Sequence, residues 1–127
     1  MKLRKQTAAA RGTAAELRAI AWLVEAGYEV AIPCNPDSRV DVVYRKQYAD
    51  GMTGPWLSAQ IKRTYPKQGH DTVNLVRSSG DRYDPTDATY LFAVGEDKLW
   101  AIPFCSVAHK SRLRITKKYD EFLKVIL

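Results

Sequence analysis

Cysteine and histidine are scarce in this sequence, which contains two residues of each. Cys34 and Cys105 lie far apart, and neither belongs to a Cys-x-x-Cys pair, so neither a disulfide framework nor a zinc ribbon is supported. The longest apolar run, Ala19 to Val24, is far shorter than the roughly 20 residues that a membrane-spanning helix needs. No apolar segment typical of a secretory signal follows the basic N-terminus. We therefore expect a chain that stays in the reducing cytoplasm.

The composition is that of an ordinary globular protein, with 46% hydrophobic and 27% charged residues among 127. This length predicts one domain, residues 1–127, and excludes a large multidomain enzyme. Lys and Arg number 20 against 14 Asp and Glu, which gives a formal net charge of +6. Such an excess favours an acidic partner, with nucleic acid first and an anionic membrane surface second. Because no strongly basic amphipathic helix with exposed aromatic residues is evident, we expect no membrane binding.

Hydrophobic spacing predicts a helix near each end of the chain. Apolar residues recur at helical spacing from about residue 9 to residue 26, and Gly27 then ends the helix. Near the C-terminus, the i, i+3, i+4 and i+7 positions of a last predicted helix are Tyr119, Phe122, Leu123 and Ile126. A further helix is expected after residue 103.

The middle of the sequence predicts strands. Segments of suitable pattern and composition are residues 28–32, 40–48, 56–64, 88–94 and 99–103. A turn rich in Gly and Pro at 50–55 predicts that the second and third strands pair antiparallel. Residues 67–86 are polar and predict loops with at most a short strand at 73–76. This order of elements predicts an α/β fold, in which α-helices pack on a mixed β-sheet.

Four polar residues are predicted to meet on this sheet. Strand alternation puts Gln60 and Lys62 on one face of the 56–64 strand. Asp41 belongs to an otherwise apolar strand, on the face opposite Val40 and Val42, and antiparallel pairing brings it beside Gln60 and Lys62. The first helix can lay Glu16 over the same place. Two carboxylates and an amide oxygen near a lysine form a site suited to a hard divalent cation such as magnesium.

Each of these residues also has an ordinary structural interpretation. Thr13 and Glu16 have the spacing of a capping box, in which both side chains satisfy free N–H groups at a helix start. Asp41 can pair with a nearby arginine, Arg39 or Arg45. Gln60 and Lys62 can be the solvated face of an antiparallel strand. The sequence leaves these alternatives open.

The sequence resembles the PD-(D/E)XK, or restriction-endonuclease-like, superfamily of nucleases. The segments that carry the resemblance are Gly12-Thr13-Ala14-Ala15-Glu16, Gly27-Tyr28-Glu29-Val30, Ser38-Arg39-Val40-Asp41-Val42-Val43, Gln60-Ile61-Lys62-Arg63-Thr64, Tyr90 to Val94 and Trp100 to Pro103. The resemblance spans roughly residues 8 to 107. Within the superfamily, the sequence is most similar to small Holliday-junction resolvases and to compact intron-encoded homing endonucleases with a Gln-x-Lys pattern.

The resemblance implies a restriction-endonuclease-like mixed β-sheet flanked by α-helices, and a metal-dependent DNA endonuclease. It assigns Glu16, Asp41, Gln60 and the Ile61 carbonyl to the metal, Mg²⁺ or Mn²⁺ as a substitute, and Lys62 to catalysis. Gln60 departs from the commoner Asp or Glu, and an amide binds a cation more weakly than a carboxylate. Because compact homing endonucleases show the same Gln-x-Lys pattern, the resemblance makes a sequence-specific homing or restriction-like enzyme the main hypothesis. A resolvase selective for branched DNA and an inactive DNA-binding module of the same fold are the alternatives.

Beside such a site, the basic residues are expected to contact double-stranded or branched DNA. The predicted contacts comprise a basic arm within residues 1–8, the start of the first helix, and the region after the third strand; they are Lys2, Arg4, Lys5, Arg11, Arg63, Lys67, Arg77 and Arg82. Tyr65 and Tyr83 either stack on bases or pack internally. Cutting both strands requires two sites, so a homodimer or larger symmetric oligomer is expected.

Overall fold

The computed structural model describes residues 1–77 and 79–126. Its α-helix is α1 (Ala8–Glu25), and two 3-10 segments are η1 (Phe104–Ser106) and η2 (Lys117–Phe122). The strands are β1 (Tyr28–Ala31), β2 (Val42–Lys46), β3 (Leu57–Arg63), β4 (Tyr65–Lys67), β5 (His70–Asn74), β6 (Tyr90–Val94), β7 (Lys98–Pro103), β8 (Arg112–Ile115) and β9 (Leu123–Val125). Among the described residues, no helix is both long and apolar enough to cross a membrane.

Each end of helix α1 is set by a local interaction or conformation. The Oγ1 of Thr7 accepts a hydrogen bond from the Ala10 N–H at 3.1 Å, which caps the first turn. Gly27 follows the helix with φ of +93°, a conformation that glycine adopts at little cost. The buried side chains, Ala15, Ala19 and Leu23, recur every four residues, so one face of α1 packs on the sheet. The expected helix and its end are confirmed.

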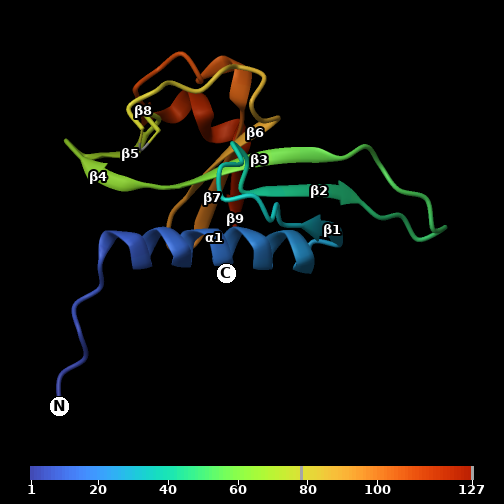
Figure 1. The fold of residues 1–127 in the computed structure, drawn as a ribbon, viewed down its shortest axis with the longest axis horizontal. Coiled ribbons are helices and arrows are strands. Elements are labelled where there is room, and N and C mark those ends of the chain that lie inside the picture. Colours follow the sequence, from blue (N-terminus) through green and yellow to red (C-terminus); the bar gives the residue numbers. More distant parts are fainter. Residues whose placement is uncertain (78, 127) are drawn as a thin grey trace.

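The main sheet is mixed, with strand order β1-β2-β3-β6-β7-β9. Strands β3 and β6 run parallel, and every other neighbouring pair in this sheet is antiparallel, including the predicted pair β2 and β3. Figure 1 shows α1 lying along one face of this sheet. Ala59 and Ile61 of β3 are buried in the core on that side, together with Leu23. The predicted mixed α/β fold is confirmed.

A second, three-stranded sheet covers the opposite face, with strand order β4-β5-β8. Figure 1 shows it on the far side of the main sheet from α1. Val73 of β5 and Leu113 of β8 are buried in one cluster with Leu91 and Ile102 of the main sheet. The loop prediction for residues 67–86 was wrong for residue 67, which ends β4, and for residues 70–72 of β5, whereas the short strand predicted at 73–76 overlaps β5 at residues 73–74. The described residues flank the main sheet with one α-helix and a small sheet, not with helices on both sides.

The helices predicted after residue 103 and at the C-terminus were also wrong. Residues 104–106 form only the short 3-10 segment η1, and the chain end forms η2 followed by strand β9. Tyr119 is buried in the core under the small sheet, whereas Ile126 is buried in the core under α1. The apolar spacing near the C-terminus therefore reflects two different cores, which no single helix face could fill.

Candidate active site

Glu16 lies on the third turn of α1 and is half-buried. The helix begins at Ala8 and is capped by Thr7, so Thr13 is inside it, not at its start. The Oγ1 of Thr13 donates a hydrogen bond to the Ala9 carbonyl at 3.1 Å. The capping-box interpretation of Thr13 and Glu16 is therefore wrong, and the Glu16 carboxylate is available for another role.

Both the backbone and the side chain of Asp41 form hydrogen bonds with β3. Its N–H donates to the Ala59 carbonyl at 2.9 Å, and its Oδ2 accepts a hydrogen bond from the Ile61 N–H at 2.7 Å. Strand β2 begins only at Val42, so Asp41 lies in the bend before the strand. Val40 consequently packs against the core opposite that of Val42, which corrects the prediction that the two share a face.

The two arginines that could have neutralised Asp41 are paired elsewhere. Arg39 forms an ion pair with Asp87 at 3.0 Å. Arg45 forms one with Glu29 at 2.7 Å. The arginine-pairing interpretation of Asp41 is therefore wrong.

Gln60 and Lys62 do not form a solvated strand face. Strand β3 lies inside the sheet between β2 and β6, and only 7% of Gln60 is exposed. Lys62 is half-buried, with its Nζ 5.5 Å from the centre of the Tyr83 ring. Tyr83 belongs to the core under the small sheet, so α1 and Lys62 lie on opposite sides of β3. Glu16 and Lys62 therefore approach Asp41 from different sides, where the prediction placed Glu16 over the Gln60 and Lys62 face.

Glu16, Asp41 and Lys62 lie close enough for their charges to affect one another's ionisation. Burial is the main cause that raises the pKa of Glu16, and the negative charge of Asp41 raises it further. Burial also raises the pKa of Asp41, against the opposing effect of the Ile61 N–H. The positive charge of Lys62 lowers the pKa of both carboxyl groups. The two acids repel each other, and Lys62 offsets only part of that repulsion.

The donor set of this site fits a hard divalent cation. Among the described residues, no hydrogen bond is formed to Oδ1 of Asp41 or to the side-chain amide of Gln60. The described part of the chain holds no group of three or more His, Cys, Asp or Glu side chains suited to a metal ion. Any cation here would therefore have the Glu16 and Asp41 carboxylates as its charged ligands and neutral groups as the rest.

Comparison with solved structures finds a similar fold in a bacterial homing endonuclease. A structure described as a bacterial homing endonuclease, I-Ssp6803I, superposes with a TM-score of 0.67 over 88% of this chain and 80% of that chain. This chain shares its fold with a homing endonuclease. The two sequences are 19% identical, which establishes the common fold alone. No protein-family model and no curated protein sequence matches the chain.

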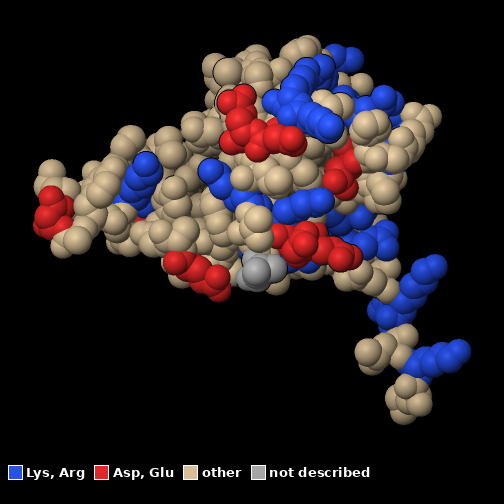
Figure 2. Space-filling view, turned by 180° about the vertical axis from the view of Figure 1, so that it is seen from behind, with Lys and Arg blue, Asp and Glu red and all other residues tan. Residues whose placement is uncertain are grey.

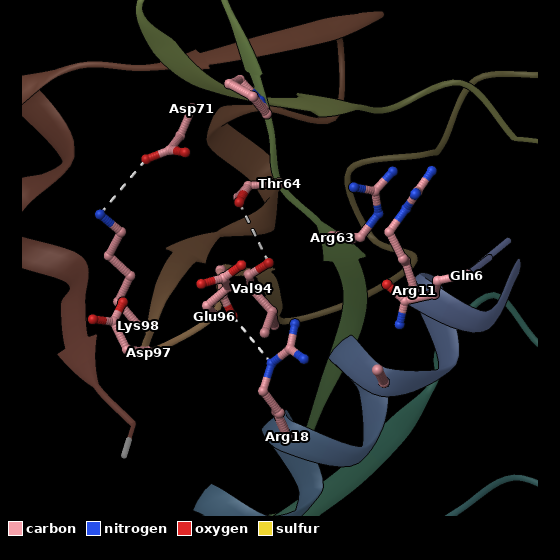
Figure 3. Close-up of a pocket in the computed structure, with 13 residues that line it drawn as sticks. Gln6, Arg11, Arg18, Arg63, Thr64, Asp71, Val94, Glu96, Asp97 and Lys98 are labelled. Atoms are coloured by element: carbon pink, nitrogen blue, oxygen red, sulfur yellow. Dashed lines mark hydrogen bonds and ion pairs between the residues drawn. The ribbon is translucent and has the colours of Figure 1, made fainter. Parts of the chain in front are cut away.

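The predicted DNA-contacting residues fall into three groups. Lys2, Arg4 and Lys5 are exposed on the arm before α1, which extends away from the body of the protein (Figure 2). Arg11 and Arg63 line one pocket, on the same side of it (Figure 3). The third group lies on or beside the small sheet and comprises Lys67, Arg77 and Arg82. Of these, Arg82 donates a hydrogen bond to the His109 carbonyl at 2.8 Å, so it also has a structural contact.

Tyr83 is a contact of the site that sequence patterns did not predict. It is 8% exposed and packs edge-on against Phe104, with ring centres 5.5 Å apart. The alternative in which it packs internally is therefore confirmed. Its ring also lies under Lys62 and, at 6.0 Å, under Arg77. No sequence signal links Tyr83 to Lys62, because the two residues belong to separate elements brought together only by the tertiary fold.

Proposed function

We propose that this protein is a metal-dependent DNA endonuclease that hydrolyses phosphodiester bonds. The observation that carries the proposal is that Asp41 lies between Glu16 and Lys62, close enough for their charges to interact, in a fold shared with a homing endonuclease. A lysine beside two acids whose pKa values are raised is expected at a site that binds a cation and acts on a phosphate. The ordinary structural interpretations of these residues do not account for their positions.

Each residue has a distinct role in the proposed reaction. Glu16, Asp41, Gln60 and the Ile61 carbonyl would hold Mg²⁺, or Mn²⁺ in its place. A divalent cation polarises a phosphate oxygen and lowers the pKa of bound water. The Ile61 N–H binds Oδ2 of the Asp41 carboxylate, which would leave Oδ1 for the cation. Lys62 orients the nucleophile and stabilises negative charge that develops on the phosphate.

The substrate we propose is double-stranded DNA, cut in a sequence-specific manner. The basic arm and the arginines and lysine near the site would contact backbone phosphates. Cutting both strands needs two sites, so we propose that the active species is a homodimer or a larger symmetric oligomer. A resolvase selective for branched DNA is the second candidate, because the superfamily resemblance covers such enzymes equally well.

A cleavage assay tests the proposal directly. Supercoiled plasmid and a synthetic four-way junction are incubated with wild-type protein, with Mg²⁺ or with EDTA. Lys62→Ala should abolish cleavage while largely keeping DNA binding. The matched control is Lys124→Ala, which also removes one lysine charge, at an exposed position on β9 outside the proposed site. Equal cleavage by wild-type protein and Lys62→Ala would refute the assignment.

The same assay separates the enzyme from an inactive DNA-binding module. Gln60 is the observation that favours the module, because an amide holds a cation more weakly than a carboxylate. Gln60→Glu should increase affinity for Mg²⁺ if the site binds metal. A module would bind DNA in a salt-sensitive manner with no cleavage and no Mg²⁺ binding by isothermal titration calorimetry in either form.

A further inference from the structure

A pocket of about 420 Å³ lies between the N-terminal half of α1 and the end of β3. Arg11 projects into it from α1, and Arg63 projects into it from the last position of β3. Figure 3 shows the two side chains extending from α1 and β3 toward the same side of the pocket. We call these two residues the arginine pair.

The arginine pair has positive charge with no partner among the described residues. Neither side chain belongs to any of the ion pairs there, which join Arg39 to Asp87, Arg45 to Glu29 and Lys98 to Asp71. The Nε of Arg11 is buried and makes no hydrogen bond. A buried N–H without an acceptor costs free energy, and two adjacent cations repel each other. An anion bound in the pocket would offset this unpaired positive charge.

The other charges of the pocket lie apart from the arginine pair. Arg18 donates through its Nε to the Gly95 carbonyl at 3.1 Å, and Lys98 contacts Asp71 at 3.8 Å. Figure 3 shows Arg18 between Glu96 and Arg11, and it shows Asp97 beside Lys98. The carboxylates of Asp71, Glu96 and Asp97 thus occupy one side of the pocket, and the arginine pair occupies the other.

The position of the arginine pair relates it to the proposed catalytic site. Arg63 directly follows Lys62, and Arg11 precedes Glu16 by five residues on the same helix, a rise of about 7.5 Å. Phosphates on one DNA strand advance about 3.4 Å each along the duplex axis. A strand whose phosphate lies at the candidate site can therefore present a phosphate one or two positions away to the arginine pair.

We propose that Arg11 and Arg63 together bind a single DNA backbone phosphate next to the cleaved position. This inference rests on the proposed function and names a substrate contact that positions the strand over Lys62. The guanidinium group is planar and donates paired N–H groups that match phosphate oxygens. Two such groups on one phosphate would fix both the distance of the DNA strand from the protein surface and its register along the site.

Salt dependence of DNA binding tests this inference without cleavage. Anisotropy of a labelled DNA duplex is measured in EDTA at several salt concentrations for wild type, Arg11→Gln, Arg63→Gln and the double variant. Each phosphate contact contributes about 0.9 to the slope of log affinity against log salt concentration. Because one phosphate is shared and either arginine alone still contacts it, the slope should stay near the wild-type value in each single variant and fall by about 0.9 in the double variant. Lys124→Ala should keep the wild-type slope.

Every other outcome contradicts the inference in an identifiable way. A slope lowered by about 0.9 in each single variant and by about 1.8 in the double variant would mean two separate phosphates, and an unchanged slope in the double variant would mean no phosphate contact. If Lys62→Ala abolishes Mg²⁺-dependent cleavage in such a case, the nuclease proposal stands and only the shared phosphate fails. Wild-type protein that binds DNA without salt dependence would contradict both. Thermal melts of each variant confirm that the slopes refer to folded protein.

Discussion

At the scale of single residues, Asp41 combines two features that a structural aspartate seldom combines. One oxygen accepts the Ile61 N–H, while burial disfavours the charge of the carboxylate and raises its pKa. A carboxyl whose folded pKa is raised adds stability below its unfolded pKa, and this stability is lost as pH rises through the folded value. In the absence of metal, the ionised pair of Glu16 and Asp41 therefore weakens the fold at neutral pH.

Asp41→Asn is predicted to be at least as stable as wild type at pH 7.5 in EDTA. Asparagine keeps an oxygen for the Ile61 N–H and removes the charge that burial disfavours. The difference should vanish near pH 3, where wild-type Asp41 is protonated, and Mg²⁺ should stabilise wild type more than the variant. Urea unfolding with EDTA or Mg²⁺ at each pH measures this. A variant less stable than wild type in EDTA at pH 7.5 would contradict the electrostatic account.

Tyr83 is predicted to support catalysis by positioning Lys62. Tyr83→Phe keeps the aromatic face under Lys62 and should cleave at nearly the wild-type rate. Tyr83→Leu removes a cation–π contact of about 0.5–1 kcal/mol, so the single-turnover rate should fall about two- to fivefold. Measurement at saturating protein separates this effect from DNA binding. Equal rates for the two variants, with both folded, would show that the ring only fills space.

At the scale of elements, the arm and the helix that follows it have separable roles. Lys2, Arg4 and Lys5 are exposed, whereas Thr7 caps α1. Deleting residues 2–5 should lower the slope of log DNA affinity against log salt by up to about 2.7 with unchanged stability. Thr7→Ala should do the reverse, costing about 1 kcal/mol in the free energy of unfolding with little effect on the slope. Anisotropy titrations and urea unfolding measure both, and a destabilised deletion variant would contradict the separation.

Elements with local signals were predicted from sequence, and elements made by distant pairing were not. Helix α1 follows from its own apolar spacing, and the β2 and β3 pair follows from the turn that joins them. Strand β5, by contrast, pairs with β8, whose Arg112 and Arg114 alternate with buried residues far along the chain. The sequence between residues 67 and 86 carries no trace of that partner, so it is typical of a loop.

The candidate site shows the same division. Glu16, Asp41 and Lys62 could be brought together in advance because a helix, a hairpin and strand alternation relate them. The sides from which Glu16 and Lys62 approach Asp41 could not be predicted, because the bend at Asp41 interrupts the strand alternation on which the prediction relied. The pairing of Arg11 with Arg63 depends on how α1 packs across β3, which no local pattern describes.

At the scale of the whole molecule, two cores share one sheet. Leu91 and Phe92 are neighbours on β6, yet Leu91 is buried under the small sheet and Phe92 under α1. The main sheet thus forms the common wall of both cores. Loss of either core would expose apolar side chains on strands whose opposite face belongs to the other core. The two cores are therefore expected to unfold together.

Phe104→Ala should therefore weaken the entire protein and not the small sheet alone. Phe104 is fully buried, and truncating such a side chain costs about 3–5 kcal/mol. Tryptophan fluorescence and far-UV circular dichroism should still report one coincident urea transition at lower denaturant. Ile32→Ala, at a site 60% exposed, should change the free energy of unfolding by less than about 0.5 kcal/mol. Two separate transitions in Phe104→Ala would contradict a shared core.

The last strand has a consequence for how the protein is made. A chain leaves the ribosome N-terminus first, so Glu16, Asp41 and Lys62 emerge well before β9. Yet β9 pairs with β7, and Ile126 fills the core under α1. A product of prematurely stopped translation at residue 120 would carry every residue of the candidate site while leaving β7 as an open edge. Such fragments should aggregate or be degraded, which would keep incomplete copies from binding DNA.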